Sequence, residues 1–323
     1  MASREPLHVK TPIRDSMALS KVAGTSVYIK MDSGQPSGSF KIRGIGHLCQ
    51  KKAEQGCKHF VCCSAGNAGM AAAYAARRLG IPATIVVPKT TPALTVERLR
   101  SEGATVEVVG ETLEEAHKLA TALAKNNSDW VFVSPFDDPL IWDGHTSIVK
   151  ELKETLRAKP GAIALSVGGG GLLCGVVQGL QEVGWGDVPI IAMETRGAHC
   201  FNAAMEAGRL VTLPNITSVA KCLGAKTVAA RALACTQELH ILSEVVEDSE
   251  AVTAVQRFLD DERMLVEPAC GAALAAIYSG LLGRLQAEGR LSPTLASVVV
   301  IVCGGNNIDS RELQELKAQL GQS

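Results

Sequence analysis

Short runs of β-branched and other apolar residues alternate with longer Ala-rich or amphipathic segments along most of this chain. The runs predict strands at residues 27–31, 60–62, 83–87, 106–109, 131–133, 163–167, 190–193 and 298–302. The segments around them predict helices at residues 39–54, 67–79, 93–102, 113–125, 140–156, 172–182, 249–260, 269–285 and 311–320. Such alternation is typical of parallel βαβ units. Because several strands are apolar throughout, we expect helices on both faces of the sheets.

The turn-rich segment 135–139, Pro-Phe-Asp-Asp-Pro, ends a stretch of compact strand–helix units that begins near Ser37. We therefore predict an α/β protein made of two doubly wound parallel-sheet domains. Residues 36–138 would form a small domain inserted into a large domain of residues 1–35 and 139–323. The length of 323 residues fits two domains of roughly 100–200 residues each.

The composition disfavours several classes of partner. With 32 Lys and Arg against 33 Asp and Glu, the formal net charge is −1, so neither nucleic acid nor an anionic membrane is an expected partner. The apolar runs are far shorter than the roughly 20 residues of a membrane-spanning helix. The N-terminal residues do not resemble a secretory signal, and the ten cysteines include no C-x-x-C pair. We therefore expect reduced thiols and a cytoplasmic location.

Four consecutive glycines, Gly168 to Gly171, lie between an apolar strand and a predicted helix. Backbone amides without side chains at a helix N-terminus favour a phosphate ligand. The spacing matches neither the dinucleotide fingerprint nor the P-loop, so a single small phosphate is expected and a dinucleotide oxidoreductase is disfavoured. A flexible turn is the alternative.

A second glycine-containing segment, Ser37–Gly44, places Lys41 in the first turn of a predicted helix. A helix N-terminus disfavours a cation. Lys41 should therefore hold its proton less tightly, as a lysine that forms a Schiff base requires. The alternative is an ordinary solvated lysine.

Two further turns follow predicted strands. The segment 63–69, Cys-Ser-Ala-Gly-Asn-Ala-Gly, offers a hydroxyl, a carboxamide and backbone amides to a carboxylate, although Ser and Asn are also common helix caps. Cys303, after the last strand, either faces a ligand or fills the core. Because ligand sites lie at the carboxyl ends of parallel strands, these turns are expected to form one site.

Together the motifs SGSFKIRG, SAGNAG and GGGG resemble those of the fold-type II pyridoxal-phosphate enzymes, the tryptophan synthase β-like fold, and specifically the serine/threonine dehydratases. This resemblance covers nearly the whole chain. It implies that pyridoxal 5'-phosphate is the cofactor and that Lys41 forms a Schiff base with it. It also implies a homodimer that takes part in amino-acid catabolism and gluconeogenesis.

The same resemblance implies roles for the other site residues. Phe40 and Cys222 would lie against the two faces of the cofactor ring, Asn67 would bind its phenolic oxygen, and Cys303 its nitrogen. Gly168, Gly169, Gly170 and Gly171 would bind its phosphate. The carboxylate of the amino-acid substrate would be held by Ser64, Ala65 and Asn67. A monovalent cation, expected to be K+, would be bound by Gly168, Glu194, Ala198, Leu223 and Ala225.

The implied reaction is β-elimination, which converts L-serine to pyruvate and ammonia through aminoacrylate, and L-threonine to 2-oxobutanoate and ammonia by the same path. Ala65 stands where racemases of this fold carry a proton-donating serine, so racemisation is not expected. Cys63 and Cys222 depart from the residues usual in dehydratases, which leaves the catalytic rate open. The alternatives are a β-replacement enzyme of the cysteine synthase type and a weakly active pyridoxal-phosphate-binding protein with a regulatory or scaffold role.

Overall fold

The computed structural model describes residues 5–322, which form two compact units. Unit 1 comprises Gln35–His145 and the described part of Met1–Val9, and unit 2 comprises Lys10–Gly34 and the described part of Thr146–Ser323. Each unit has its own sheet. The sequence predicts a small domain of residues 36–138 inserted into a large domain of residues 1–35 and 139–323. That these two segments fold independently remains a prediction.

The sheet of unit 1 has the strand order β5-β4-β3-β6, and all of its neighbouring strands are parallel. Its elements in chain order are α2 (Lys41–Glu54), β3 (His59–Cys62), α3 (Asn67–Leu79), β4 (Ala83–Val87), α4 (Ala93–Ser101), β5 (Thr105–Val108), α5 (Leu113–Asn126) and β6 (Trp130–Val133). Alternate residues of β3 point to opposite faces. Phe60 and Cys62 belong to the apolar cluster beneath α2 and α3, whereas Val61 belongs to a second cluster beneath α5. Both faces of this sheet are therefore covered.

The sheet of unit 2 has six strands in the order β1-β2-β10-β7-β8-β9. These strands are β1 (Ile13–Asp15), β2 (Val27–Met31), β7 (Ala162–Ser166), β8 (Ile190–Thr195), β9 (Ile241–Val246) and β10 (Val298–Val302). Only the edge pair β1 and β2 is antiparallel among them. Because β7 and β10 lie in the middle of the sheet, every one of their side chains is buried.

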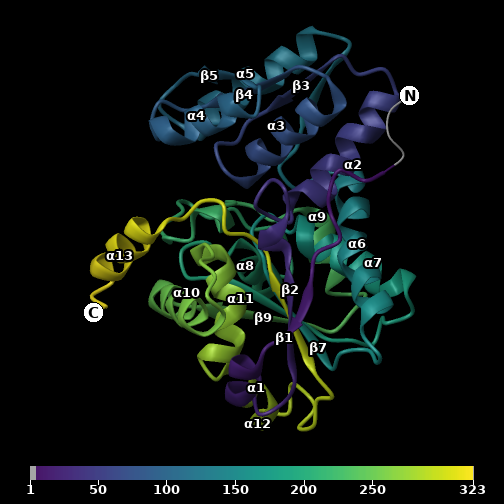
Figure 1. The fold of residues 1–323 in the computed structure, drawn as a ribbon, viewed down its shortest axis with the longest axis vertical. Helices are drawn as coiled ribbons and strands as arrows, with labels where there is room; N and C mark the ends of the chain where they lie inside the picture. The colour runs from purple at the N-terminus through teal and green to yellow at the C-terminus, as the bar shows by residue number, and fades with distance from the viewer. Residues whose placement is uncertain (1–4, 323) are drawn as a thin grey trace. The chain divides into compact units, whose positions relative to one another are not determined.

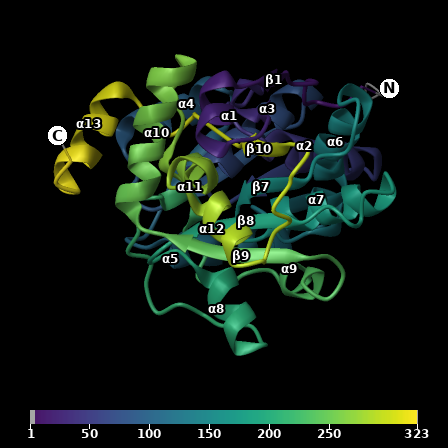
Figure 2. The same ribbon diagram turned by 90° about the horizontal axis from the view of Figure 1, so that it is seen from below.

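Helices cover both faces of this second sheet. They are α1 (Met17–Ala23), α7 (Gly171–Glu182), α8 (Cys200–Ala207), α9 (Ala230–Cys235), α10 (Asp248–Glu262), α11 (Pro268–Tyr278), α12 (Leu281–Ala287) and α13 (Ser310–Gln319). A further helix, α6 (Pro139–Thr155), includes the unit boundary, and Asp32–Gly34 and Lys221–Leu223 form short 3-10 turns, η1 and η2. Figure 2 shows α10, α11 and α12 on one side of the sheet and α7 and α9 on the other, and Figure 1 shows α10 beside α11.

Both sheets are parallel except for the edge pair β1 and β2, and this confirms the predicted α/β fold class. The prediction of one helix over residues 269–285 is wrong, because α11 ends at Tyr278 and α12 begins at Leu281. Gly280 lies between them with φ +76°, a backbone conformation that glycine adopts without strain. The short elements β1, α1, α8, α9 and β9 were not predicted.

No single helix of the described chain meets the length and hydropathy expected of a membrane span. Within residues 5–322, only the helices α11 and α12 taken together, with a bend of 47° between them, meet both criteria. Every residue of α11 is buried in unit 2, which agrees with a core helix of the fold.

Candidate active site

Lys41 is the first residue of α2 in unit 1, and its side chain is half-buried. Its Nζ donates a hydrogen bond of 2.5 Å to the carbonyl oxygen of Pro135, which follows β6. The same Nζ lies 5.4 Å from the centroid of the Phe40 ring. The structure therefore places the Lys41 amine at the carboxyl end of the sheet of unit 1, where the strand-to-helix turns gather.

The turn of residues 63–69 lies beside α2, because α3 packs against that helix. Asn67 is the first residue of α3, and no side chain caps that helix N-terminus in the described structure. A Cβ atom at Gly69 would lie 2.0 Å from the carbonyl oxygen of Ser64, so this tight turn requires glycine. Ser64, Ala65 and Asn67 are therefore near an uncapped helix N-terminus, which favours a carboxylate.

The glycine loop, Gly168–Gly171, joins β7 to α7 in unit 2. Gly170 has φ +93°, and a Cβ atom there would lie 2.5 Å from Cβ of Ala232 on α9. The amide of Ala229, which precedes α9, donates to the carbonyl oxygen of Gly169 at 2.9 Å. In the described structure no side chain caps α7. The loop is thus a fixed turn that leaves helix N-terminal amides for an anion, and flexibility does not account for its glycines.

Glu194 lies near the end of β8 with none of its surface exposed. Its two carboxylate oxygens accept hydrogen bonds from the amides of Phe201, at 2.9 Å, and Asn202, at 2.7 Å, in the first turn of α8. Burial raises the pKa of Glu194 to about 8, although the two amide hydrogen bonds oppose that shift. A buried carboxylate of this kind favours a nearby positive charge.

The other residues of the expected cation site lie in the same unit. A Cβ atom at Gly168 would lie 3.2 Å from Cα of Leu223, so these two backbones are in contact. The thiol of Cys200, the first residue of α8, donates to the carbonyl oxygen of Gly168 at 3.5 Å. Ala198 pairs with Thr195 beside Glu194, and the Ala225 amide donates to the carbonyl oxygen of Leu223. One carboxylate with several carbonyls is a donor set that suits a hard cation.

Cys303 and Cys222 also lie in unit 2. Cys303 follows β10 and is almost fully buried, and a hydrogen bond with Cys270, followed by burial, raises the pKa of its thiol well above the ordinary value. Cys303 is therefore a neutral thiol. Cys222 is exposed, its thiol donates to Oε2 of Glu267 at 3.6 Å, and it accepts from Nδ2 of Asn307 at 3.3 Å.

Sequence reasoning missed several of these contacts. The Pro135 carbonyl is a backbone group that no side-chain pattern indicates. Cys270 and Glu267 lie in and before an apolar helix, where nothing in the sequence distinguishes them. The buried hydroxyls of Ser37 and Ser39 belong to the segment SGSFKIRG, but the sequence indicates no role for them. Within residues 5–322 neither hydroxyl has a hydrogen-bond partner.

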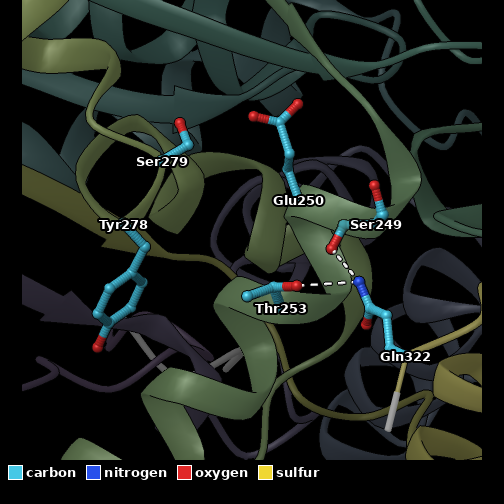
Figure 3. A pocket seen from close by; sticks show the side chains of 6 residues that line it. All are labelled: Ser249, Glu250, Thr253, Tyr278, Ser279 and Gln322. Atoms are coloured by element: carbon cyan, nitrogen blue, oxygen red, sulfur yellow. Dashed lines mark hydrogen bonds between the residues drawn. The ribbon is translucent and has the colours of Figure 1, made fainter.

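A separate pocket of about 300 Å³ lies in unit 2 beside α10 and the end of α11 (Figure 3). It is lined by Ser249, Glu250, Thr253, Tyr278, Ser279 and Gln322. Gln322 donates hydrogen bonds to the Ser249 carbonyl and the Thr253 hydroxyl, and the Tyr278 hydroxyl donates to Asp261. None of the predicted site residues lines this pocket.

Residues 5–304 match the family described as "Pyridoxal-phosphate dependent enzyme", and the chain belongs to this family. It is 74% identical over 321 residues to mouse L-serine dehydratase/L-threonine deaminase, covering 99% of this chain and 98% of that protein. It is 69% identical over 321 residues to human serine dehydratase-like, covering 99% and 97%.

A solved structure gives the same fold. The L-serine ammonia-lyase of the fungus Rhizomucor miehei superposes with a TM-score of 0.91 at 39% sequence identity, covering 98% of this chain and 99% of that one. These similarities confirm the family resemblance that the three sequence motifs indicated.

Proposed function

We propose that this chain is a lyase that uses pyridoxal phosphate to convert L-serine to pyruvate and ammonia, and L-threonine to 2-oxobutanoate and ammonia. The observation that carries the proposal is the position of Lys41, whose amine lies at the start of α2 among strand-to-helix turns. The close relatives named for these two activities support the choice of substrates.

Each unit, taken by itself, has residues that fit one part of the cofactor. In unit 2 the glycine loop offers uncapped α7 amides to the phosphate, and a side chain on Gly170 would meet α9. In unit 1, Phe40 would lie against the ring and Asn67 would bind its phenolic oxygen. When bound, pyridoxal phosphate supplies an aldehyde that condenses with amines and a ring that accepts electron density from the substrate Cα.

The remaining steps of the reaction use side chains and backbone groups of the chain itself. The backbone amides and hydroxyl of the turn of residues 63–69 hold the substrate carboxylate, which orients Cα toward Lys41. The Lys41 amine takes the Cα proton, and that proton passes to the β-hydroxyl, which leaves as water. Lys41 is thereby a free amine again for the next turnover. The released enamine, 2-aminoacrylate from L-serine or 2-aminocrotonate from L-threonine, hydrolyses to the oxo acid and ammonia.

The test is to incubate the purified chain and pyridoxal phosphate with L-serine or L-threonine and to measure pyruvate, 2-oxobutanoate and ammonia. Equal amounts of oxo acid and ammonia are expected. With sulfide added, cysteine in place of pyruvate would indicate β-replacement instead. A visible cofactor absorbance without ammonia release would indicate a binding protein. We further propose that the chain forms a homodimer and acts in the cytoplasm. Size-exclusion chromatography tests the first of these properties and cell fractionation the second.

Ala65 should prevent racemisation, because its methyl side chain has no proton to give to the opposite face of Cα. With L-serine as substrate, chiral chromatography should detect D-serine forming far more slowly than pyruvate. The variant Ala65→Ser should raise the D-serine rate relative to pyruvate. D-serine produced by the unaltered chain at a rate similar to pyruvate would contradict this role.

The neutral thiol of Cys303 should favour elimination over transamination, since it does not stabilise a positive charge on a pyridine nitrogen as a carboxylate does. The variant Cys303→Asp should therefore convert a larger share of the cofactor to pyridoxamine phosphate during turnover, as measured by chromatography. The matched variant Cys303→Ser stays neutral and should not. The same product share in all three proteins would count against this account.

Potassium should stabilise the chain through Glu194. Replacing tetramethylammonium chloride with KCl should raise the midpoint of thermal unfolding by on the order of 2–5 °C, since a ligand of the folded state stabilises it. Glu194→Gln should abolish that increase. Glu206→Gln, on the exposed side of α8, is the matched control and should retain it. An increase that persists in Glu194→Gln would exclude Glu194 as a ligand.

A further inference from the structure

His145 is a buried histidine of unit 1 to which the proposed reaction assigns no role. Its ring has none of its surface exposed. The ring packs against Phe40, with 5.0 Å between the two centroids and 50° between the planes. Phe40 directly precedes Lys41, the first residue of α2. The imidazole therefore contacts the residue that leads into the proposed catalytic helix.

Two glycines allow this contact. A Cβ atom at Gly144 would lie 2.8 Å from Cα of Gly44, so the backbones of α2 and α6 approach closely at this point. A Cβ atom at Gly44 would lie 2.7 Å from Cε1 of His145 and 2.6 Å from the carbonyl oxygen of Ile141. The ring thus fills a space with little room for movement, bounded on one side by α2 and on another by Phe40.

The electrostatic surroundings keep this ring neutral. Burial first, and then the charges of Lys41 and Arg43 on α2 and of His8 on the N-terminal segment, lower the pKa of His145 well below its ordinary value. The nearby carboxylate on its own helix, Asp143, pairs with His47 at 2.9 Å. Neither ring nitrogen of His145 has a hydrogen-bond partner within residues 5–322. A proton added to this ring would therefore be a buried charge among positive neighbours, with no described acceptor for it.

We propose that His145 is a positioning residue for Lys41: its neutral ring braces Phe40 and thereby fixes the first turn of α2. This inference rests on the proposed function of Lys41. The volume of the His145 side chain holds Phe40 in place. Because the imidazole can take up a proton, this contact is sensitive to acid. A proton on the imidazole would disrupt its packing against Phe40 and displace the Lys41 amine.

The experiment compares three variants of the full chain in the presence of pyridoxal phosphate. His145→Ala removes the brace, whereas His145→Leu and His145→Gln keep a similar volume and cannot take up a proton near neutral pH. The readouts are the visible absorbance of the bound cofactor as a function of pH, its dissociation constant, and kcat and KM for L-serine. His47→Ala is the matched control, since it removes a histidine of α2 that packs beside Asp143.

We expect His145→Ala to lower kcat by about 10–100-fold at neutral pH with little change in KM, because a small displacement of a reacting group has an effect of this size. The Leu and Gln variants should keep most of kcat. The unaltered chain should lose its visible absorbance with the uptake of one proton at a pH well below about 6.5, the ordinary pKa of histidine, because burial and the neighbouring positive charges lower the pKa of His145. In the Leu and Gln variants this loss should move to lower pH, and His47→Ala should behave like the unaltered chain.

Several outcomes would overturn the inference. A kcat in folded His145→Ala equal to that of His47→Ala would show that the ring does not position Lys41. An acid transition that is unchanged in the Leu and Gln variants would exclude titration of His145 as its cause. If His145→Ala does not fold, the acid transition of the Leu and Gln variants still tests the inference, since an unchanged transition would contradict it. If the unaltered chain itself shows neither cofactor absorbance nor ammonia release, the proposed function fails, and that result is distinct from either outcome above.

Discussion

Lys41→Ala is expected to lower the rate of pyruvate formation from L-serine by about 10⁴-fold or more, because one amine both holds the cofactor and moves the Cα proton. Formation of 2-oxobutanoate from L-threonine should fall equally. Folding should be little affected, since the Lys41 side chain is only half-buried and donates a hydrogen bond to a backbone carbonyl, that of Pro135. The measurement is oxo-acid release with saturating pyridoxal phosphate, together with far-UV circular dichroism.

Lys51→Ala is the matched control for that variant. Lys51 lies on the same helix, its side chain is 44% exposed, and it pairs with Glu54 at 3.4 Å on the surface. Such an exposed pair contributes little to stability, so both activity and unfolding should stay close to those of the unaltered chain. Lys41→Ala with activity similar to Lys51→Ala would exclude the proposed mechanism.

Glu151→Ala is expected to have the largest effect on stability, a loss of about 3–5 kcal/mol in the free energy of unfolding, because it leaves a buried charge without its partner. Lys30 on β2 has none of its surface exposed, and its Nζ donates to Oε2 of Glu151 at 2.5 Å and to the Thr11 carbonyl at 2.7 Å. The Thr11 amide also donates to that carboxylate, at 3.4 Å. Urea unfolding of unaltered and variant chains measures the loss.

Glu154→Ala is the matched control on the same helix. Glu154 pairs with Lys10 at 2.8 Å, but the two side chains are 64% and 57% exposed, so the expected loss is below about 1 kcal/mol. The double variant Lys30→Met with Glu151→Leu should recover most of the stability, since an apolar pair of similar volume avoids the unpaired charge. Equal losses in Glu151→Ala and Glu154→Ala would show that burial does not govern this ion pair.

Much of the fold could be predicted from the sequence because its strands carry their own signal. The runs rich in β-branched and other apolar residues that become β2, β4 and β10 lie at the bounds expected from the sequence pattern. The misses have a physical cause. β1 has three residues and α9 has six, which is too short for a periodic pattern, and the break at Gly280 lies inside a run whose apolar residues continue on both sides.

Some residues of the candidate site could be predicted from the sequence, and others could not. Lys41 and the glycine loop could be found because strand-to-helix turns with unusual residues are visible in a sequence. Glu194 could be predicted as a cation ligand only through the family resemblance, because a single carboxylate at a strand end gives no signal of its own. His145 could not be found at all. Its contact with Phe40 depends on the close approach of Gly44 and Gly144, which are distant in sequence.

The exposure of Cys222 gives the chain a built-in reporter. All ten cysteines lie in the described part of the chain, and Cys222 alone is exposed while the other nine are buried. A thiol reagent added to the folded chain should therefore react rapidly at Cys222 alone, and unfolding should make all ten thiols available to it. Counting modified thiols by mass spectrometry would then measure how often each variant, Glu151→Ala included, opens under conditions in which it is still mostly folded.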